Sequence, residues 1–129
     1  MRPINLVFEG GGVKGIAHVG ALYALETIPA LQKEVKIAGV GGTSAGAIIA
    51  ALYAAGYSAE DLRKELDKTS LGHLIGKPVG YMRSAYRLWR RKGIYETSEI
   101  YTWLRNLLER KKVVTFKDLH QKRQFPAEL

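Results

Sequence analysis

The sequence predicts an α/β fold: a parallel sheet with helices on both faces. Short apolar runs alternate with longer helical segments through the first 56 residues, and a glycine-rich segment stands at each change from strand to helix. This order is typical of parallel strands joined by right-handed crossovers. Because two short strands make a poor parallel sheet by themselves, further strands are expected beyond Leu129.

The first strand and the first helix flank a run of three glycines. Ile4–Phe8 has the apolar pattern of a short buried strand, which Glu9 and the glycines interrupt. The helix expected over Ile16–Thr27 carries apolar residues on more than one stripe, which predicts burial on two sides. Pro29 is expected to end this helix.

A second strand and two further helices follow. Val35–Val40 is an apolar run ended by glycines, and Ala45–Ala55 is an almost wholly apolar helix, as expected for one packed centrally against a sheet. Gly56 is its expected C-cap. A third helix is expected from Ser58 to about Lys68, with Ser58 as N-cap and an acid three residues later completing a capping box.

The second half of the chain is more helical and more basic. Residues 69–80 read as a loop and Tyr81–Lys92 as a basic amphipathic helix suited to a membrane surface or to packing on the core. Ser98–Arg110 follows the apolar spacing of a helix, and Thr115–Leu119 is expected to add one more turn. The net charge of +8 arises entirely after residue 60. Such a charge favours a phosphate-bearing partner such as an anionic membrane, although a solvated basic surface explains it equally well.

Length and composition restrict the class of protein. A chain of 129 residues suffices for one modest domain, and the lack of cysteine excludes disulfides and a thiol nucleophile. The start of the chain lacks the apolar stretch of a signal peptide. The longest apolar run, around Ala45–Gly56, is too short to span a bilayer. The protein is therefore expected in the cytoplasm or at the periphery of a membrane.

A G-x-S-x-G motif lies between the second strand and its apolar helix, formed by Gly42, Thr43, Ser44, Ala45 and Gly46. In this context the motif indicates a nucleophile elbow, where a strained turn exposes the serine hydroxyl. The glycines let neighbouring backbones approach, and the helix N-terminus favours a developing anion. The N–H of Ala45 can donate to that anion. The alternative is a small-residue turn in which Ser44 merely caps the helix.

A second glycine motif, Glu9–Gly15, also separates a strand from a helix. Its glycines are Gly10, Gly11, Gly12 and Gly15, and such a run lets several backbone N–H groups point into one anion site. Beside a nucleophile, the anion would be the tetrahedral intermediate of acyl transfer. Together the two motifs predict a serine acyl hydrolase.

The same loop matches the G-x-G-x-x-G fingerprint of dinucleotide-binding proteins. That function needs an acid at the end of the second strand, whereas Val40 is followed there by glycines and Glu34 precedes the strand. No Gly-Lys-Ser/Thr follows the loop, so it is not a Walker loop. A nucleotide-binding domain stays an alternative, as does a non-catalytic basic module that binds membranes.

The two motifs resemble those of the patatin-like phospholipase family, which has an acid-Gly-Gly-Gly-x-Arg/Lys-Gly loop and then a Gly-Thr-Ser-Ala-Gly elbow. Lys92–Tyr95 and Thr115–Leu119 resemble family segments less specifically, so the resemblance covers nearly the whole chain. It implies a patatin-like core and a Ser–Asp dyad that hydrolyses phospholipids or other acyl-ester lipids. By this likeness the nucleophile is Ser44. The oxyanion hole is formed by backbone N–H groups, those of Gly11, Gly12 and Ala45.

The chain departs from the family at the second member of the dyad. The family's catalytic aspartate lies in an Asp-Gly motif, and this chain has no Asp-Gly dipeptide; its aspartates are Asp61, Asp67 and Asp118. Residues 1–129 are therefore expected to be the N-terminal portion of a single acyl-hydrolase domain, with the remaining strands and the dyad aspartate beyond Leu129. The chain alone is expected to be inactive, because an unactivated serine hydroxyl is a poor nucleophile.

Two further residues adjoin the glycine loop. His18 lies one turn into the following helix, where a packing role is commoner than a catalytic one, and Lys14 either approaches a lipid phosphate or faces solvent. The three histidines share no metal-ligand spacing, so no metal or other cofactor is expected. The expected partner is an acyl-ester lipid, with peripheral contact to an anionic membrane and no nucleic acid.

Overall fold

The computed structural model of the chain describes residues 1–11, 15–69 and 98–122. Within these ranges, strands and helices alternate at first and helices follow alone. The sheet is parallel, so the predicted α/β class is confirmed. The loop predicted at 69–80, the basic helix predicted over Tyr81–Lys92 and the family-like segment Lys92–Tyr95 lie outside the described residues, apart from residue 69.

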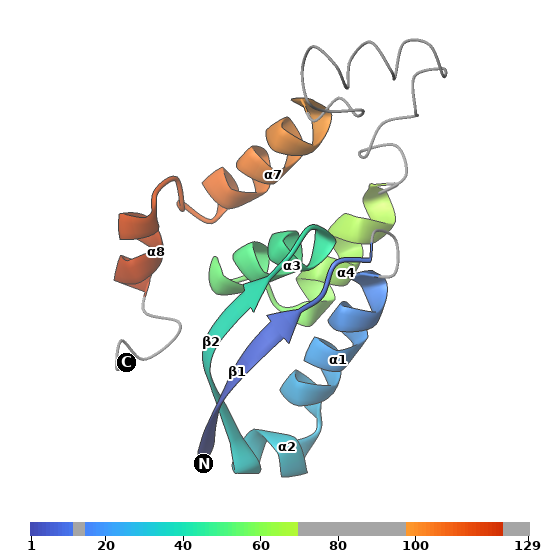
Figure 1. Ribbon diagram of the computed structural model, residues 1–129, viewed down its shortest axis with the longest axis vertical. Helices are drawn as coiled ribbons and strands as arrows, with labels where there is room; N and C mark the ends of the chain where they lie inside the picture. Colours follow the sequence, from blue (N-terminus) through green and yellow to red (C-terminus); the bar gives the residue numbers. More distant parts are fainter. Residues whose placement is uncertain (12–14, 70–97, 123–129) are drawn as a thin grey trace.

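Two strands, β1 (Arg2–Phe8) and β2 (Val35–Gly42), run in the same direction and form the sheet (Figure 1). The register pairs Phe8 with Gly42 at their carboxyl ends, with an irregularity after Ile4. Both strands therefore stop at the same edge of the sheet. As a result, the two glycine motifs that follow the strands begin next to each other.

The described helices include one that the sequence did not predict. Their bounds are α1 (Ile16–Thr27), α2 (Pro29–Glu34), α3 (Ala45–Ala54), α4 (Ala59–Lys68), α7 (Ser98–Arg110) and α8 (Phe116–Lys122). Pro29 does end the first helix, but it also opens α2. Proline suits the first position of a helix because its fixed φ is already helical and its missing N–H would have no partner there.

Two predicted caps are confirmed at the turn between α3 and α4. Gly56 takes a φ of 101° just after α3, a conformation that glycine adopts without a steric penalty. Ser58 then begins α4 with a capping box, its side chain accepting from the N–H of Asp61 while the carboxylate of Asp61 accepts from the N–H of Ser58. These two caps fix the angle at which α4 leaves α3.

One face of the sheet packs on the helices. Leu6 and Phe8 of β1 and Val40 of β2 belong to, or pack against, the buried core. The opposite face is open, since Val7 is 81% exposed and a Cβ added at Gly41 would meet no described atom within 4 Å. None of the described helices covers this second face around Val7, so the second helical layer that the sequence predicts does not fall within the described residues.

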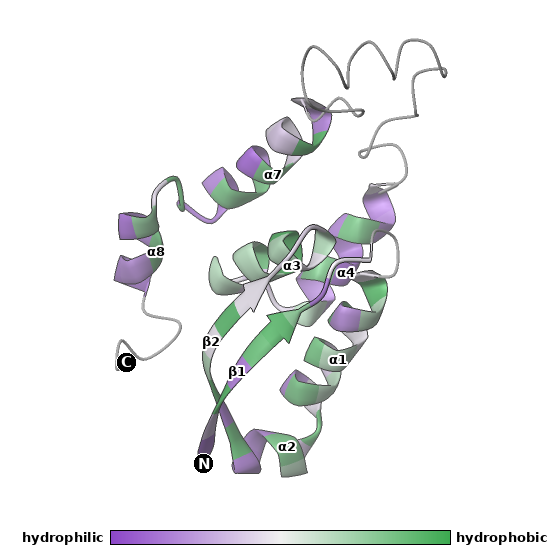
Figure 2. Cartoon of the chain, in the orientation of Figure 1, coloured by the Kyte–Doolittle hydropathy of each residue, from purple (hydrophilic) through white to green (hydrophobic). Residues whose placement is uncertain are grey.

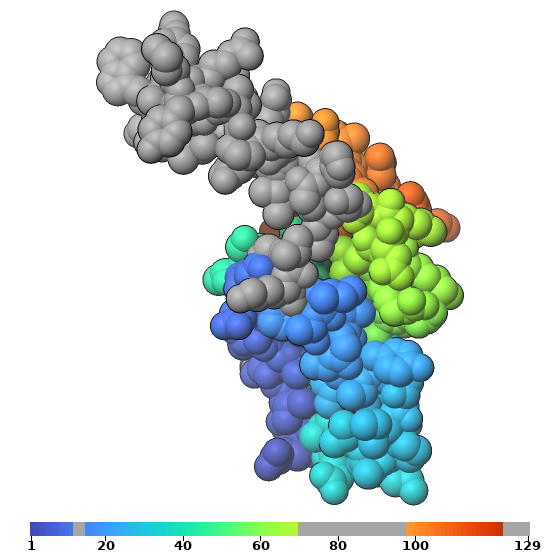
Figure 3. All heavy atoms as spheres, turned by 90° about the vertical axis from the view of Figure 1, so that its right-hand side faces the viewer, coloured from blue at the N-terminus to red at the C-terminus, as the bar shows by residue number. Residues whose placement is uncertain are grey.

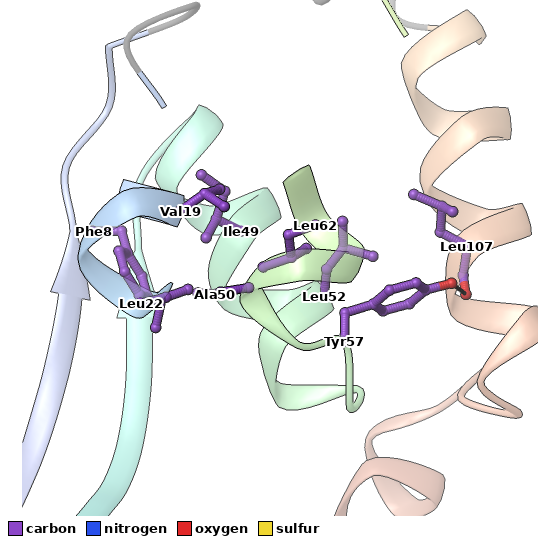
Figure 4. Close-up of a cluster of buried hydrophobic side chains, with 10 residues drawn as sticks. Phe8, Val19, Leu22, Ile49, Ala50, Leu52, Tyr57, Leu62 and Leu107 are labelled. Atoms are coloured by element: carbon purple, nitrogen blue, oxygen red, sulfur yellow. Dashed lines mark hydrogen bonds between the residues drawn. The ribbon is translucent and has the colours of Figure 1, made fainter. Parts of the chain in front are cut away.

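The core runs from the sheet through α1, α3 and α4 to α7 (Figure 4). Its largest fully buried side chains are Leu22, Leu52, Leu62 and Leu107. The α3 helix is apolar along its whole length, whereas α4 and α7 each have a polar side (Figure 2). Because α3 is surrounded by other elements, its N-terminus is held firmly against the end of the sheet. No helix in the described ranges is long and apolar enough to cross a membrane.

The hydroxyl of Tyr57 links the α3–α4 turn to α7. It donates a buried hydrogen bond of 2.7 Å to the carbonyl of Leu107, which Figure 4 shows as a dashed line. The N–H of Lys111 bonds to Leu108 instead of to Leu107, so the helix end does not replace this donor. Tyr57→Phe should therefore lower the free energy of unfolding by about 1–2 kcal/mol.

Urea denaturation measures this effect, and Tyr101→Phe is the matched control because Tyr101 is 65% exposed. The control should unfold at the wild-type midpoint. Equal midpoints for the two variants would contradict the assigned role of the Tyr57 hydroxyl.

Candidate active site

Ser44 stands on the sharp turn between the end of β2 and the start of α3. Its φ of 52° and ψ of −126° lie outside the regions that residues with a side chain prefer, at a cost of about 1–3 kcal/mol. Although Ser44 occupies the N-cap position, its side chain makes no capping hydrogen bond and its backbone is not extended, as an ordinary N-cap requires. The turn therefore exposes the hydroxyl rather than using it to cap the helix.

Gly42 and Gly46, on either side of Ser44, allow the backbones to approach closely. A Cβ on Gly42 would lie 2.5 Å from the carbonyl carbon and oxygen of Gly46. A Cβ on Gly46 would lie 2.4 Å from the carbonyl oxygen of Phe8 and 2.5 Å from that of Glu9. All of these neighbours are backbone atoms, so no side chain can move aside to make room. The first turn of α3 is thus seated directly on the end of β1.

The glycine loop begins against the nucleophile elbow. A Cβ added at Gly10 would lie 3.1 Å from the Cβ of Ser44. The N–H of Gly10 donates to Oγ1 of Thr43 over 3.1 Å, and the N–H of Thr43 donates to the carbonyl of Phe8 over 3.1 Å. These bonds tie together two segments 33 residues apart. Sequence reasoning missed the part played by Thr43, whose only signal was a hydroxyl at a variable position of the motif.

The N–H of Ala45 is placed to receive negative charge. The N–H groups of Gly46 and Ala47 both donate to the carbonyl of Thr43, over 2.9 and 3.3 Å. Among the residues that the structure describes, none accepts from the N–H of Ala45, which has no partner one turn earlier because it opens the helix. The positive end of the α3 dipole adds to the attraction for an anion here.

Of the other two predicted donors, Gly11 and Gly12, only Gly11 lies within the described residues. Gly10 is not a donor to substrate, because Thr43 takes its N–H. Gly11 follows Gly10 and is exposed. Gly12 and Lys14 lie outside the described residues. Gly15, after the loop, again lies close to the elbow, because an added Cβ there would lie 3.8 Å from the Cβ of Ala45.

His18 supports the glycine loop. Its Nε2 lies 3.1 Å from the carbonyl oxygen of Glu9, so this nitrogen must carry the donated hydrogen. The ring also packs edge-on against Phe8, with 5.4 Å between the ring centroids. The bond fixes the residue that precedes the three glycines, which is a packing role and not that of a catalytic base.

Each aspartate of the chain is engaged in a local structural contact. Asp61 completes the capping box of α4, and Asp67 lies 3.2 Å from the guanidinium of Arg63. Asp118 accepts from the N–H groups of Val114 and Thr115, and these bonds hold its pKa below the usual value. Such bonds favour the ionised form of the carboxylate where it stands. None of these partners of the three aspartates is Ser44.

The described part of the chain holds no group of three or more histidine, cysteine, aspartate or glutamate side chains that could bind a metal ion. The chemistry that the described site offers is that of one exposed hydroxyl, a helix N-terminus and backbone N–H groups. Such a set can attack a carbonyl carbon and stabilise the oxyanion that results.

The model of the patatin-like phospholipase family matches residues 6–127. The chain is 35% identical over 122 residues to the Bacillus subtilis protein YqhO, which is 92% of this chain and 40% of that protein. It is 37% identical over 86 residues to lysophospholipase nte1 of Neurospora crassa, covering 67% of this chain and 5% of the relative. The chain thus spans about two-fifths of the length of the Bacillus relative. No solved structure shows a significant match.

Proposed function

The chain belongs to the patatin-like phospholipase family, and from this premise we propose that it carries the nucleophile and oxyanion hole of a serine hydrolase of acyl lipids. The observation that supports this most directly is the position of Ser44. It is held at a φ of 52° between the end of β2 and the apolar helix α3, with Gly10 of the glycine loop beside its Cβ. A strained residue of this kind is retained where the strain serves a function.

The proposed reaction begins with attack of Oγ of Ser44 on the ester carbonyl carbon. The serine proton passes to the carboxylate of the dyad, and the carbonyl oxygen becomes an oxyanion that accepts from the N–H of Ala45 and of Gly11 and Gly12. The alcohol part of the lipid then leaves with that proton, and an acyl group stays on Ser44. Water, deprotonated by the same carboxylate, hydrolyses the acyl-serine and frees the fatty acid.

We place the dyad aspartate outside this chain. Asp61, Asp67 and Asp118 are all held in helix caps or surface ion pairs. The Bacillus relative is more than twice as long as the matched region, which leaves room for the missing strands and the acid. Residues 1–129 alone should therefore hydrolyse esters no faster than background.

The substrate class follows from the relatives and the charge. Relatives of the chain include proteins named lysophospholipase, so we propose a lysophospholipid or a related acyl-ester lipid as the substrate. The basic excess after residue 60 would favour peripheral contact with the anionic membrane in which such lipids lie. The dinucleotide alternative gains no support, because the family match points to a phospholipase and β2 ends in glycines where that fingerprint needs an acid.

The direct test measures fatty acid released from palmitoyl lysophosphatidylcholine by the longest form of the protein obtainable from its source, beside the 129-residue chain. We expect release by the longer form only. If neither form hydrolyses any acyl ester, the proposed function is wrong. If the 129-residue chain is as fast as the longer form, the acid must be one of its own three aspartates.

The bond between Thr43 and Gly10 gives a second prediction. Thr43→Val keeps the shape of the side chain and removes the acceptor for the N–H of Gly10, so the loop should lose its register beside Ser44. In the longer form, kcat for ester hydrolysis should fall about tenfold, with a loss of about 1 kcal/mol in unfolding free energy. Thr102→Val is the control, because that hydroxyl bonds only to an exposed carbonyl in α7. Equal kcat in both variants would contradict the role given to Thr43.

A further inference from the structure

An apolar groove of about 470 Å³ lies between α1 and α4, two helices that Figure 3 shows side by side on one face of the molecule. Its volume falls in the range of small-molecule sites. Its walls come from both helices: Ile16, Val19, Gly20, Tyr23, Ala59, Glu60 and Arg63. We propose that this groove binds the acyl chain of the lipid whose ester bond Ser44 attacks, an inference that rests on the proposed function.

The groove begins beside the nucleophile elbow. Ile16, the first residue of α1, lines the groove and directly follows Gly15, where an added Cβ would lie 3.8 Å from the Cβ of Ala45. The groove therefore reaches the N-terminus of α1, one residue after the point where Gly15 packs against the start of α3. From Ile16 to Tyr23 the wall of α1 extends about 10 Å. A chain attached to the reacting carbonyl would thus lie along α1, away from the sheet.

The lining suits hydrocarbon better than a charged headgroup. Ile16 is 46% exposed and Tyr23 50% exposed, although the apolar stripes of α1 predict burial on two sides. Within the described ranges, this side of the helix therefore lacks an apolar neighbour that covers it. The two charged residues of the groove, Glu60 and Arg63, are paired with each other at 3.1 Å. Each methylene that enters such a groove should strengthen binding by about fourfold.

Gly20 keeps the middle of the groove empty. A Cβ there would meet no described atom within 4 Å, so steric crowding does not explain why a glycine occupies the interior of α1. Glycine destabilises a helix relative to alanine, and an isolated one commonly has a packing or functional reason. A larger side chain at this position would fit the backbone and fill the space that the acyl chain needs.

The test uses the longest form of the protein and the variants Gly20→Leu and Ala21→Leu. Ala21 is exposed on the same helix and does not line the groove, so the control adds the same side chain beside it. Titration with cis-parinaric acid, a fluorescent fatty acid, reports binding without any turnover. We expect Gly20→Leu to weaken binding at least tenfold and Ala21→Leu to stay within twofold of wild type.

Two ester substrates separate the groove from the chemistry. In Gly20→Leu, kcat/KM for a p-nitrophenyl palmitate should fall at least tenfold, while that for p-nitrophenyl butyrate should stay within twofold of wild type. If the wild type fails to bind cis-parinaric acid, or if both variants bind it equally, the proposal that the groove binds the acyl chain is wrong, whether or not esters are hydrolysed. Wild type that binds the fatty acid but hydrolyses neither ester overturns the proposed hydrolase and leaves the groove standing as a fatty-acid site.

Discussion

Replacing Ser44 by alanine is expected to lower kcat/KM for acyl-ester hydrolysis by about 10⁵-fold in the longest form of the protein. The nucleophilic oxygen is then missing, and residual rate can come only from the oxyanion site and substrate binding. Release of fatty acid from a lysophospholipid, followed over hours, measures a loss of this size. The matched control is Ser58→Ala, which removes the N-cap of α4 and should cost about 1 kcal/mol of stability while turnover stays near wild type.

The Ser44→Gly variant shows that this loss does not come from misfolding. Glycine accepts a φ of 52° and a ψ of −126° without the strain that a Cβ causes. Ser44→Gly should therefore be more stable than Ser44→Ala by about 1 kcal/mol and equally inactive. A Ser44→Ala variant that keeps a tenth of wild-type turnover would contradict the assignment of the nucleophile.

Replacing Gly46 by alanine is expected to cost about 3 kcal/mol or more of unfolding free energy. The added methyl would lie 2.4 Å from the carbonyl oxygen of Phe8 and 2.5 Å from that of Glu9, and neither backbone atom can move without displacing the end of β1. Thermal or urea unfolding of purified protein measures the change. If the variant does not accumulate as folded protein, limited proteolysis beside wild type gives the same comparison.

Gly41→Ala is the matched control for this prediction. Gly41 lies in the same strand end, and its added methyl would meet no described atom within 4 Å, so its stability should stay within about 1 kcal/mol of wild type. Similar unfolding midpoints for Gly41→Ala and Gly46→Ala would mean that the elbow is not as tightly packed as the structure indicates.

The sequence was most informative where local chemistry determines structure. The bounds of α1 and α7, the glycine cap after α3 and the capping box of Ser58 follow from patterns within a few residues, and the structure confirms them. The family resemblance, carried by the two glycine motifs, is confirmed by the family match over residues 6–127. Short motifs of this kind specify the local backbone geometry, so the family could be predicted from the sequence alone.

The rest depends on contacts between distant residues. The bond from Gly10 to Thr43 spans 33 positions, and no local pattern indicates that one hydroxyl accepts from the other motif. Pro29 can equally end one helix or begin the next, and only the structure shows that it does both. The apolar stripes of α1 likewise do not indicate which element packs against each of them. The groove beside Gly20 could therefore not be predicted from the sequence.

The central claim is that Ser44 is the nucleophile, and mapping of a fluorophosphonate adduct by mass spectrometry tests it most directly. The reagent phosphonylates only an activated serine, so the longest form of the protein should carry one adduct. Cleavage at tyrosine and leucine separates Ser44 from Ser58, and the adduct should lie on the peptide that contains Ser44 and not on the one that contains Ser58. An adduct on a different serine, or ester turnover that continues after Ser44 has been fully modified, would contradict the account.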